Sequence, residues 1–185
     1  APANFAYYAS ALGHRGIVAS RIGQDQLGKE ALDLLNSSKV DTSFLQTDEL
    51  APTGTVVVEN DPKNQPQYTI PEEVAWDYLD WGDKWQTLAS QADVICFGSV
   101  AQRSPQSRHA IRRFIRAAGK DCLRIFDANL FQPWYSVEKI NESMLLADIV
   151  KLSDTELPQT FRTLGLKLQN LRNSARLLLD TFGLK

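Results

Sequence analysis

In residues 81–185, short continuous apolar runs alternate with amphipathic stretches. Three of the runs predict strands buried in a sheet: residues 93–100, 122–127 and 148–152. The run at 93–100 is apolar enough to predict a strand covered on both faces. Four stretches predict helices: residues 81–91, 104–118, 136–147 and 164–182. Ser104 is the predicted N-cap of the second helix, with Pro105 at its first position. Strands alternating with helices predict parallel pairing through helical crossovers, and therefore an α/β fold.

Residues 1–80 follow a less regular pattern. Residues 3–12 are small and apolar, which predicts a buried helix that ends at Gly13. A second, amphipathic helix is predicted at 25–39, with an apolar stripe formed by Leu27, Ala31, Leu34 and Leu35. Three segments are strand-like: residues 16–22, 40–45 and 53–59. A polar turn at 60–67 and a returning strand from 68–70 make the last of these segments one arm of a β hairpin.

Composition and charge argue against a nucleic-acid or membrane partner. The chain of 185 residues is 43% hydrophobic and 23% charged, with a net charge of −2, as in ordinary globular domains. No apolar run reaches the roughly 18 residues of a membrane span. One basic run has helical spacing and is interpreted as a solvated helix face: Arg108, Arg112, Arg113 and Arg116.

Cysteine and histidine usage favours a cytosolic protein without a zinc site. Cys96 and Cys122 each lie in an apolar run and are expected to be buried free thiols, although a disulfide stays open. His14 and His109 belong to no Cys/His cluster. No signal peptide is visible, and a cytoplasmic location is expected. The chain begins at Ala1 rather than methionine, so it looks processed or trimmed.

The ends of the predicted parallel strands are the places to search for a binding site. In such sheets, ligands bind beyond the carboxyl ends of the strands. The segments that follow the three predicted strands are 98–99, 127–129 and 153–156. They contain hydroxyl, amide and carboxylate groups that can bind hydroxyls, phosphates or a metal ion.

The spacing of small residues near the start of the chain resembles a known family signature. Pro2, Asn4 and Ala6 have the pattern P-x-N-x-A, six residues precede Gly13, and nine more precede Gly23. This pattern is similar to the N-terminal signature of the PfkB family of carbohydrate kinases, without its leading glycine pair. Many fixed positions make it far more specific than a single glycine motif.

Three later segments agree with the family in the expected order. Residues 51–54 resemble its APTG element, which leads into a lid strand. Residues 126–131 are similar to FDPNLR, with Ala128 and Phe131 in place of proline and arginine. Residues 151–156 are similar to an element ending in N-x-x-E, with a serine in place of the asparagine. The segment 97–105 looks like bacterial fructokinases, and the resemblance extends from Pro2 to about residue 156.

The resemblance implies a ribokinase-like three-layer α/β sandwich with a mainly parallel sheet and a small β lid at about 53–70. It implies a single incomplete domain over 1–185, with the C-terminal part missing. The activity implied is ATP-dependent phosphorylation of a sugar hydroxyl, of the fructokinase type, with ATP and Mg²⁺ as cofactors. A sugar is the expected substrate, and a homodimer through the lid is the expected assembly.

The resemblance also assigns roles to particular residues. It implies substrate binding by five residues: Asn4, Gly23, Asp25, Asp127 and Asn129. Ser153 and Glu156 take the cofactor side, where Glu156 reaches Mg²⁺ through water. Each role has a structural alternative. Asn4 and Asp25 are also suited to capping helices, Asp127 and Asn129 to a turn, and Glu156 to an exposed helical turn. Lys151 either approaches a nucleotide phosphate or is solvated, and solvation is predicted.

Two departures limit what the resemblance implies. Phe131 replaces an arginine whose guanidinium would bind an acidic group, which argues against an acidic sugar as substrate. The family's catalytic aspartate lies in a G-A-G-D segment that this sequence lacks, so the chain alone is expected to show no turnover. The alternatives are a kinase for another sugar or a nucleoside, and a non-catalytic binding or assembly module. A nicotinamide-dependent enzyme is disfavoured because no G-x-G-x-x-G follows the first strand.

Overall fold

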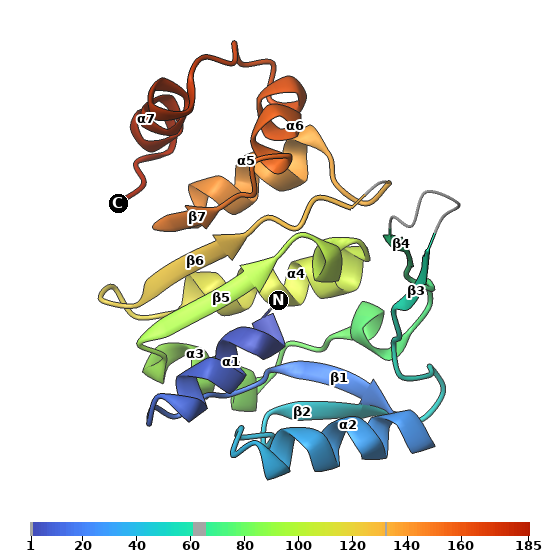
Figure 1. Cartoon of the computed structure of the whole chain (residues 1–185). Helices are drawn as coiled ribbons and strands as arrows, with labels where there is room; N and C mark the ends of the chain where they lie inside the picture. The colour runs from blue at the N-terminus through green and yellow to red at the C-terminus, as the bar shows by residue number, and fades with distance from the viewer. Residues whose placement is uncertain (1, 61–65, 132) are drawn as a thin grey trace. The chain divides into compact units, whose positions relative to one another are not determined.

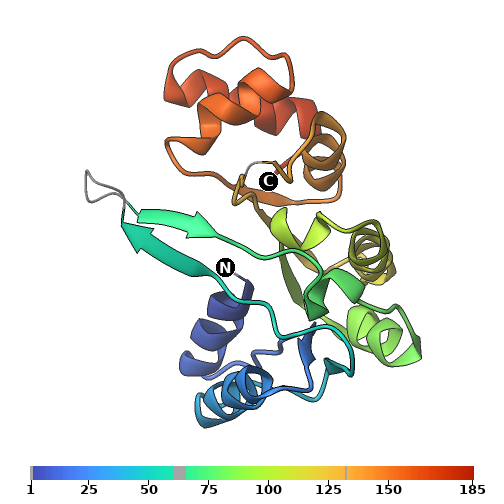
Figure 2. The same cartoon turned by 90° about the vertical axis from the view of Figure 1, so that its right-hand side faces the viewer.

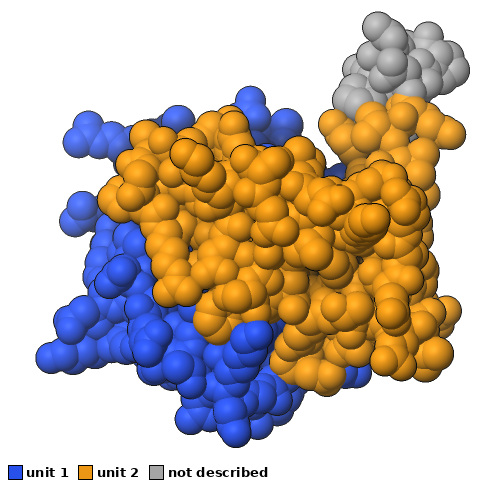
Figure 3. All heavy atoms as spheres, turned by 90° about the horizontal axis from the view of Figure 1, so that it is seen from below, with its two compact units in different colours: residues 1–5, 81–185 blue, residues 6–80 orange. Residues whose placement is uncertain are grey.

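The structure is a computed structural model, and it describes residues 2–60, 66–131 and 133–185. The chain divides into two compact units: residues 1–5 with 81–185, and residues 6–80 (Figure 3). Each unit is described below by itself. The sequence-based prediction of a single incomplete domain over 1–185 stays a prediction.

A three-stranded parallel sheet forms the centre of the unit that contains residues 81–185 (Figure 1). Its strands are β5 (Val94–Gly98), β6 (Leu123–Asp127) and β7 (Ile149–Lys151), hydrogen-bonded in that order. The register places Gly98 opposite Asp127, and Asp127 opposite Lys151. The predicted parallel strands are therefore confirmed, and their carboxyl ends lie at one edge of the sheet.

Helices of this unit connect the strands, as the apolar pattern predicted. They are α3 (Asp83–Gln91), α4 (Pro105–Ala117), α5 (Val137–Leu145), α6 (Glu156–Thr163) and α7 (Leu171–Phe182), with a short 3₁₀ turn, η2, at Val100–Gln102. Ser104 caps α4 by accepting a hydrogen bond from the N–H of Ser107, with Pro105 at the first helical position, as predicted. Ser136 caps α5 in the same way.

The helix predicted at 164–182 is wrong in its first part. Helix α6 ends before that segment, because Gly165 has a φ of 68° in the left-handed region. Residues 166–170 connect the two helices, and the Asn170 side chain caps α7. The last predicted helix is therefore two helices joined by a turn.

One hydrophobic core holds this unit together. Phe97 of β5 and Phe126 of β6 stack with ring centroids 5.3 Å apart. Helices α4 to α7 contribute the remaining large core side chains: Ile115, Ile140, Met144, Phe161 and Leu178. Strand β5 is less covered than predicted, because Val94 is exposed and Cys96 is only half-buried. Its inward residues alternate with these two, so burial is strongest on one face of the sheet.

The unit of residues 6–80 is built on a parallel pair, β1 (Ser20–Gly23) and β2 (Leu45–Asp48), with α2 (Gln26–Ser37) between them in sequence. Both strands begin later than predicted. A single bridge joins Ile17 to Asp41, and pairing resumes only at Ser20 and Leu45. The delay arises because residues 41–45 turn: the Asp41 carboxylate accepts the Ser43 N–H, and the Leu45 N–H bonds the carbonyl of residue 42.

The predicted hairpin is confirmed, although its first strand is shorter than expected. Strands β3 (Val57–Asn60) and β4 (Pro66–Thr69) pair antiparallel and extend away from the rest of their unit (Figure 2). Residues 53–54 are not part of β3, because Thr53 bonds another loop and Gly54 lies against the ring of Trp76. Residues 61–65 of the predicted turn lie outside the described residues. A 3₁₀ turn, η1 (Ala75–Tyr78), follows the hairpin.

The predicted burial of the first helix is wrong. Helix α1 (Pro2–Ala11) buries only Ala6, and Tyr7, Tyr8 and Leu12 in and just after the helix are exposed. In α2, the apolar stripe leaves Leu27 and Leu34 exposed. Among the helices of the described residues, none has the length and apolar character needed to cross a bilayer.

Candidate functional site

The strongest polar cluster of the larger unit lies where β6 and β7 end, and Glu156 is at its centre. The side chain of this first residue of α6 is buried, with 9% of the residue exposed. Its Oε1 accepts the Leu130 N–H at 3.0 Å, and its Oε2 accepts the Ser153 N–H at 2.6 Å. The alternative of an exposed helical turn is therefore wrong. Glu156 holds the loop after β6 to the loop after β7.

Glu156 is ionised at neutral pH despite its burial. Burial by itself raises the pKa of this carboxyl, but the hydrogen bonds from Ser153 and Leu130 outweigh it and hold the pKa below its usual value. The positive charge of Lys151 acts in the same direction. A carboxylate oxygen has two lone pairs, so each oxygen can also accept a hydrogen bond from water.

Ser153 binds Glu156, the first residue of α6, through both its N–H and its hydroxyl. Its Oγ accepts the Glu156 N–H at 3.2 Å while its own N–H binds the Glu156 carboxylate. The hydroxyl also lies 3.0 Å from the Thr155 hydroxyl. This reciprocal arrangement pairs the N–H groups of Ser153 and Glu156. The first N–H groups of a helix in general favour a bound anion.

Asp127 and Lys151 form an ion pair across β6 and β7. The Lys151 ammonium lies 2.9 Å from Asp127 Oδ1, as the strand register allows. The hydrogen bond to Asp127 is the main reason that the pKa of Lys151 is raised. Lys151 is 56% exposed at its side chain, so the prediction of simple solvation is half wrong: the side chain reaches solvent but is paired.

Asn129 supports the turn that follows β6. Its φ of 45° lies in the left-handed region, which asparagine tolerates better than most residues. Its carbonyl accepts a hydrogen bond of 2.8 Å from the buried hydroxyl of Ser99. The loops after β5, β6 and β7 are thus joined by two hydrogen-bonded links, through Ser99 and through Glu156.

In the smaller unit, Asp25 joins the end of β1 to residues 51–54. Asp25 Oδ1 accepts the Gly28 N–H and the Thr53 hydroxyl, both at 2.7 Å, and Oδ2 accepts the Thr53 N–H at 2.7 Å. The capping alternative for Asp25 is confirmed, since it is the N-cap of α2. The hydrogen bonds, that of the Thr53 hydroxyl first, lower the pKa of Asp25.

Gly23 approaches the same threonine. Its N–H donates to Thr53 Oγ1 at 2.9 Å, and a Cβ at this position would lie 2.6 Å from the Thr53 nitrogen. A side chain at residue 23 would therefore displace this loop. Thr53 was missing from the predicted site residues, although the APTG resemblance was a signal for it.

Asn4 lies at the third position of α1 and is exposed. It is inside the helix, so the alternative that it caps this helix is wrong. The structure brings Asp127, Asn129, Ser153 and Glu156 to one sheet edge, and Gly23 and Asp25 to one loop junction in the other unit. The binding roles of all these residues stay predictions.

The basic face of α4 differs from its predicted solvated state. The side chains of Arg108 and Arg112 are each only 18% exposed. Arg108 pairs with Glu138 and Glu142 at 2.7 Å each, and Arg112 pairs with Glu142. These two arginines therefore link α4 to α5. The prediction of a solvated face was wrong for them because the helical spacing of the arginines does not reveal their acidic partners on α5.

Of the two cysteines that were expected to be buried, Cys122 is buried and Cys96 is only half-buried. Cys96 and Cys122 are free thiols, which excludes the disulfide that was left open. In the part of the chain that the structure describes, no three His, Cys, Asp or Glu side chains gather in a group that could hold a metal ion. A metal at Glu156 would thus have one protein carboxylate, as suits an ion that keeps its waters.

Parallel strands connected by helices, together with a β hairpin, define an α/β protein. Comparison with known sequences gives the family: residues 1–180 match the pfkB family of carbohydrate kinases. The chain belongs to this family, as its N-terminal signature predicted.

The relatives carry sugar-kinase names. A putative sugar kinase of Pyrococcus horikoshii is 31% identical over 163 residues, which are 85% of this chain and 52% of that protein. Probable fructokinase-2 of Arabidopsis thaliana is 28% identical over 164 residues, or 85% of this chain and 50% of the relative. The chain thus spans about half the length of the curated relatives that it matches.

Solved structures confirm the predicted fold class. The Pyrococcus sugar kinase in complex with ATP superposes with a TM-score of 0.76 at 28% identity, over 91% of this chain and 57% of the other. Fructokinase from Xylella fastidiosa has a TM-score of 0.83 at 21% identity, over 97% and 56% of the two chains. The fold is ribokinase-like α/β.

Proposed function

We propose that the protein containing this chain transfers the γ-phosphoryl group of ATP to a hydroxyl of a neutral sugar, as a fructokinase does. Family membership and the names of the relatives support this proposal. The observation that carries it is Glu156, an ionised carboxylate fixed by the N–H groups of Leu130 and Ser153 at the carboxyl edge of β6 and β7.

The cofactor side of the proposed site is the start of α6. Glu156 would hold Mg²⁺ through water, and Mg²⁺ would supply charge to offset the phosphate oxygens. Ser153 lies next to the first N–H groups of the helix, which favour a bound phosphate. Lys151 presents its ammonium at the same edge, held there by Asp127.

The sugar side would use hydroxyl-binding groups from several elements. We assign contacts with sugar hydroxyls to Asn4, Asp127 and Asn129, whose amide and carboxylate groups suit such contacts. The carboxylate of Asp25 already accepts three hydrogen bonds, so we propose that Asp25 and Gly23 act within their own unit, by fixing the backbone around Thr53.

A neutral sugar is proposed because residue 131, in the segment after β6, is a phenylalanine. It has no guanidinium group that could bind an acidic group of a substrate. The Phe131 ring stacks on Trp134 with centroids 6.5 Å apart. The guanidinium of Arg103 lies 4.7 Å from the centroid of the same indole, which engages it in a cation–π contact.

Two measurements on the 185-residue chain test the proposal. Calorimetry with ATP and Mg²⁺ is expected to show saturable binding that Glu156→Gln weakens about tenfold and the exposed-site control Asp180→Asn leaves unchanged. A coupled ADP-release assay with fructose is expected to show no turnover, because the sequence has no G-A-G-D segment. Clear turnover would refute the missing-base argument. Undetectable nucleotide binding would favour a non-catalytic module.

We further propose that the hairpin of β3 and β4 pairs with a second copy of the protein. Both strands of a two-stranded sheet have an unpaired edge, and the hairpin region exposes Val56, Val57, Val58 and Tyr68. Light scattering is expected to show a dimer that Val58→Lys dissociates. A strictly monomeric wild-type chain at high concentration would contradict this assembly.

A further inference from the structure

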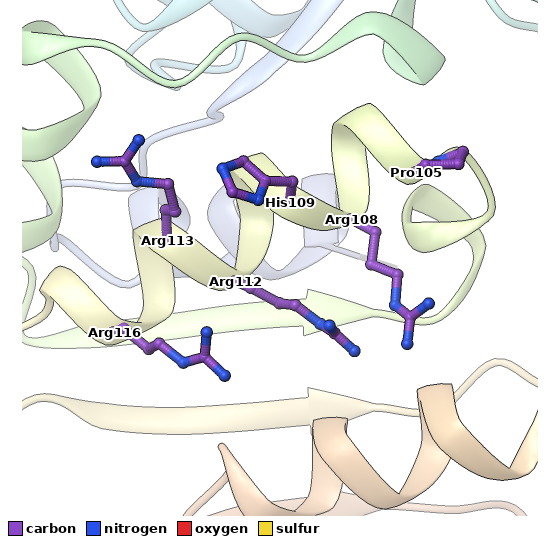
Figure 4. A pocket seen from close by; sticks show the side chains of 6 residues that line it. All are labelled: Pro105, Arg108, His109, Arg112, Arg113 and Arg116. Atoms are coloured by element: carbon purple, nitrogen blue, oxygen red, sulfur yellow. The ribbon is translucent and has the colours of Figure 1, made fainter.

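The outer surface of α4 carries a pocket of about 250 Å³ that the proposed kinase site does not use. Five of its six lining residues are basic, and all six belong to α4: Pro105, Arg108, His109, Arg112, Arg113 and Arg116. Positions four residues apart lie on the same side of a helix. Figure 4 accordingly shows Arg108, Arg112 and Arg116 in one row, with His109 and Arg113 in another.

Neighbouring elements fix several of these side chains in place. Glu138 and Glu142 of α5 hold Arg108, and Glu142 also holds Arg112. On the other row, the Arg113 guanidinium lies 5.3 Å from the centroid of the Trp81 ring. Three of the four arginines are therefore pre-positioned, which reduces the loss of side-chain entropy when a ligand binds.

The two glutamates do not neutralise the pocket. They carry two negative charges against four guanidinium groups and pair with only two of these, Arg108 and Arg112. The Nε atoms of both arginines are buried without a hydrogen-bond partner among the described residues. Burial, together with the charges of Arg108 and Arg116, lowers the pKa of Arg112. Excess positive charge with unused N–H donors favours an anion that can accept several hydrogen bonds.

We propose that the two rows of α4 bind a small phosphate-bearing anion between them. The volume corresponds to roughly eight water molecules at about 30 Å³ each, which is enough for a phosphate or a diphosphate group. A polynucleotide fits less well, because the chain carries a net charge of −2 and the basic residues that line the pocket all belong to one helix. The ligand is therefore a small molecule rather than a nucleic acid.

The test is a titration of the ¹⁵N-labelled chain with inorganic phosphate and with pyrophosphate, without Mg²⁺, at constant ionic strength set by chloride. The two probes distinguish a site for a single phosphate from one for a diphosphate. Saturable shifts are expected among the amides of residues 106–117. Arg116→Glu is expected to weaken binding at least about tenfold.

Two controls separate this site from the proposed kinase site. Arg172→Glu makes the same charge change at an exposed position of α7 and is expected to leave the affinity within about twofold. If Arg116→Glu unfolds the chain, Arg113→Gln serves as the second variant. Equal effects of the α4 and α7 variants, no saturation, or shifts confined to residues 153–156 would each overturn the inference. The kinase proposal has its own test, calorimetry with ATP and Mg²⁺, and none of these three results refutes it.

Discussion

Replacing Glu156 by glutamine tests whether this carboxylate is the link between the loops after β6 and β7. The change keeps the size of the side chain and removes its charge. Two backbone N–H groups, from Leu130 and Ser153, now donate to a carboxylate, and hydrogen bonds to a charged acceptor contribute about 1.5–3 kcal/mol each. Glutamine can accept only one of them and turns its NH₂ toward the other donor. The free energy of unfolding is expected to fall by about 2–4 kcal/mol.

The pH dependence identifies the charge as the cause. The folded-state pKa of Glu156 lies below its unfolded value, so its contribution to stability is present above pH values near 4.5 and is lost as the pH falls through the folded pKa. The difference in unfolding free energy between wild type and Glu156→Gln, from urea denaturation followed by circular dichroism, should therefore shrink between pH 7 and pH 3. Asp180→Asn, an exposed control in the same unit, should cost below about 0.5 kcal/mol. A loss below that value for Glu156→Gln, or a difference independent of pH, would refute the reasoning.

Three further predictions concern other sites. Gly23→Ala should destabilise the unit of residues 6–80 by about 1–3 kcal/mol in urea denaturation, because its Cβ would lie 2.6 Å from the Thr53 nitrogen. Gly82→Ala, whose Cβ would meet no atom within 4 Å, should cost less, below about 1 kcal/mol for the loss of a glycine N-cap of α3. Thr53→Val should cost about 1–3 kcal/mol by the same assay, since it removes one of the three hydrogen bonds to the Asp25 carboxylate and leaves the Gly23 N–H without its acceptor. An unchanged transition would contradict the loop junction. Burial raises the pKa of Cys96 to about 11. At pH 8 its thiol should therefore react with a disulfide reagent at least about tenfold more slowly in the native chain than in the chain unfolded in urea. Equal rates would contradict the half-buried state of Cys96.

The sequence was most informative where local signals agree. The strands and helices from α3 to β7 were predicted close to their observed bounds, because continuous apolar runs, Ser104 and Pro105 all indicate the same boundaries. Helix α6 was missed because its eight residues include Pro158 and few apolar positions. It is stabilised by tertiary contacts: Phe161 enters the core, and the Glu156 carboxylate binds the preceding loop.

The candidate site was predictable in its residues but not in its contacts. Strand order alone places Asp127, Asn129 and Glu156 at one sheet edge. Their partners come from 24 to 30 positions away in the chain, as in the pair Asp127–Lys151 and in the bond from Ser99 to the Asn129 carbonyl. Only the fold brings such groups together, and the same holds for the glutamates that pair with the arginines of α4.

The contacts of Glu156 show how Ser153 can fill the position at which the N-x-x-E element that this segment resembles has asparagine. The carboxylate is held by the main-chain N–H of Ser153, and every residue except proline offers that donor. The hydroxyl at 153 accepts a longer hydrogen bond from the Glu156 N–H, at 3.2 Å, and lies 3.0 Å from the Thr155 hydroxyl. A loop geometry that is fixed through backbone groups is thus insensitive to this substitution. The serine at position 153 is therefore compatible with the proposed cofactor side of the site. A different residue at position 156 would be a much stronger argument against it.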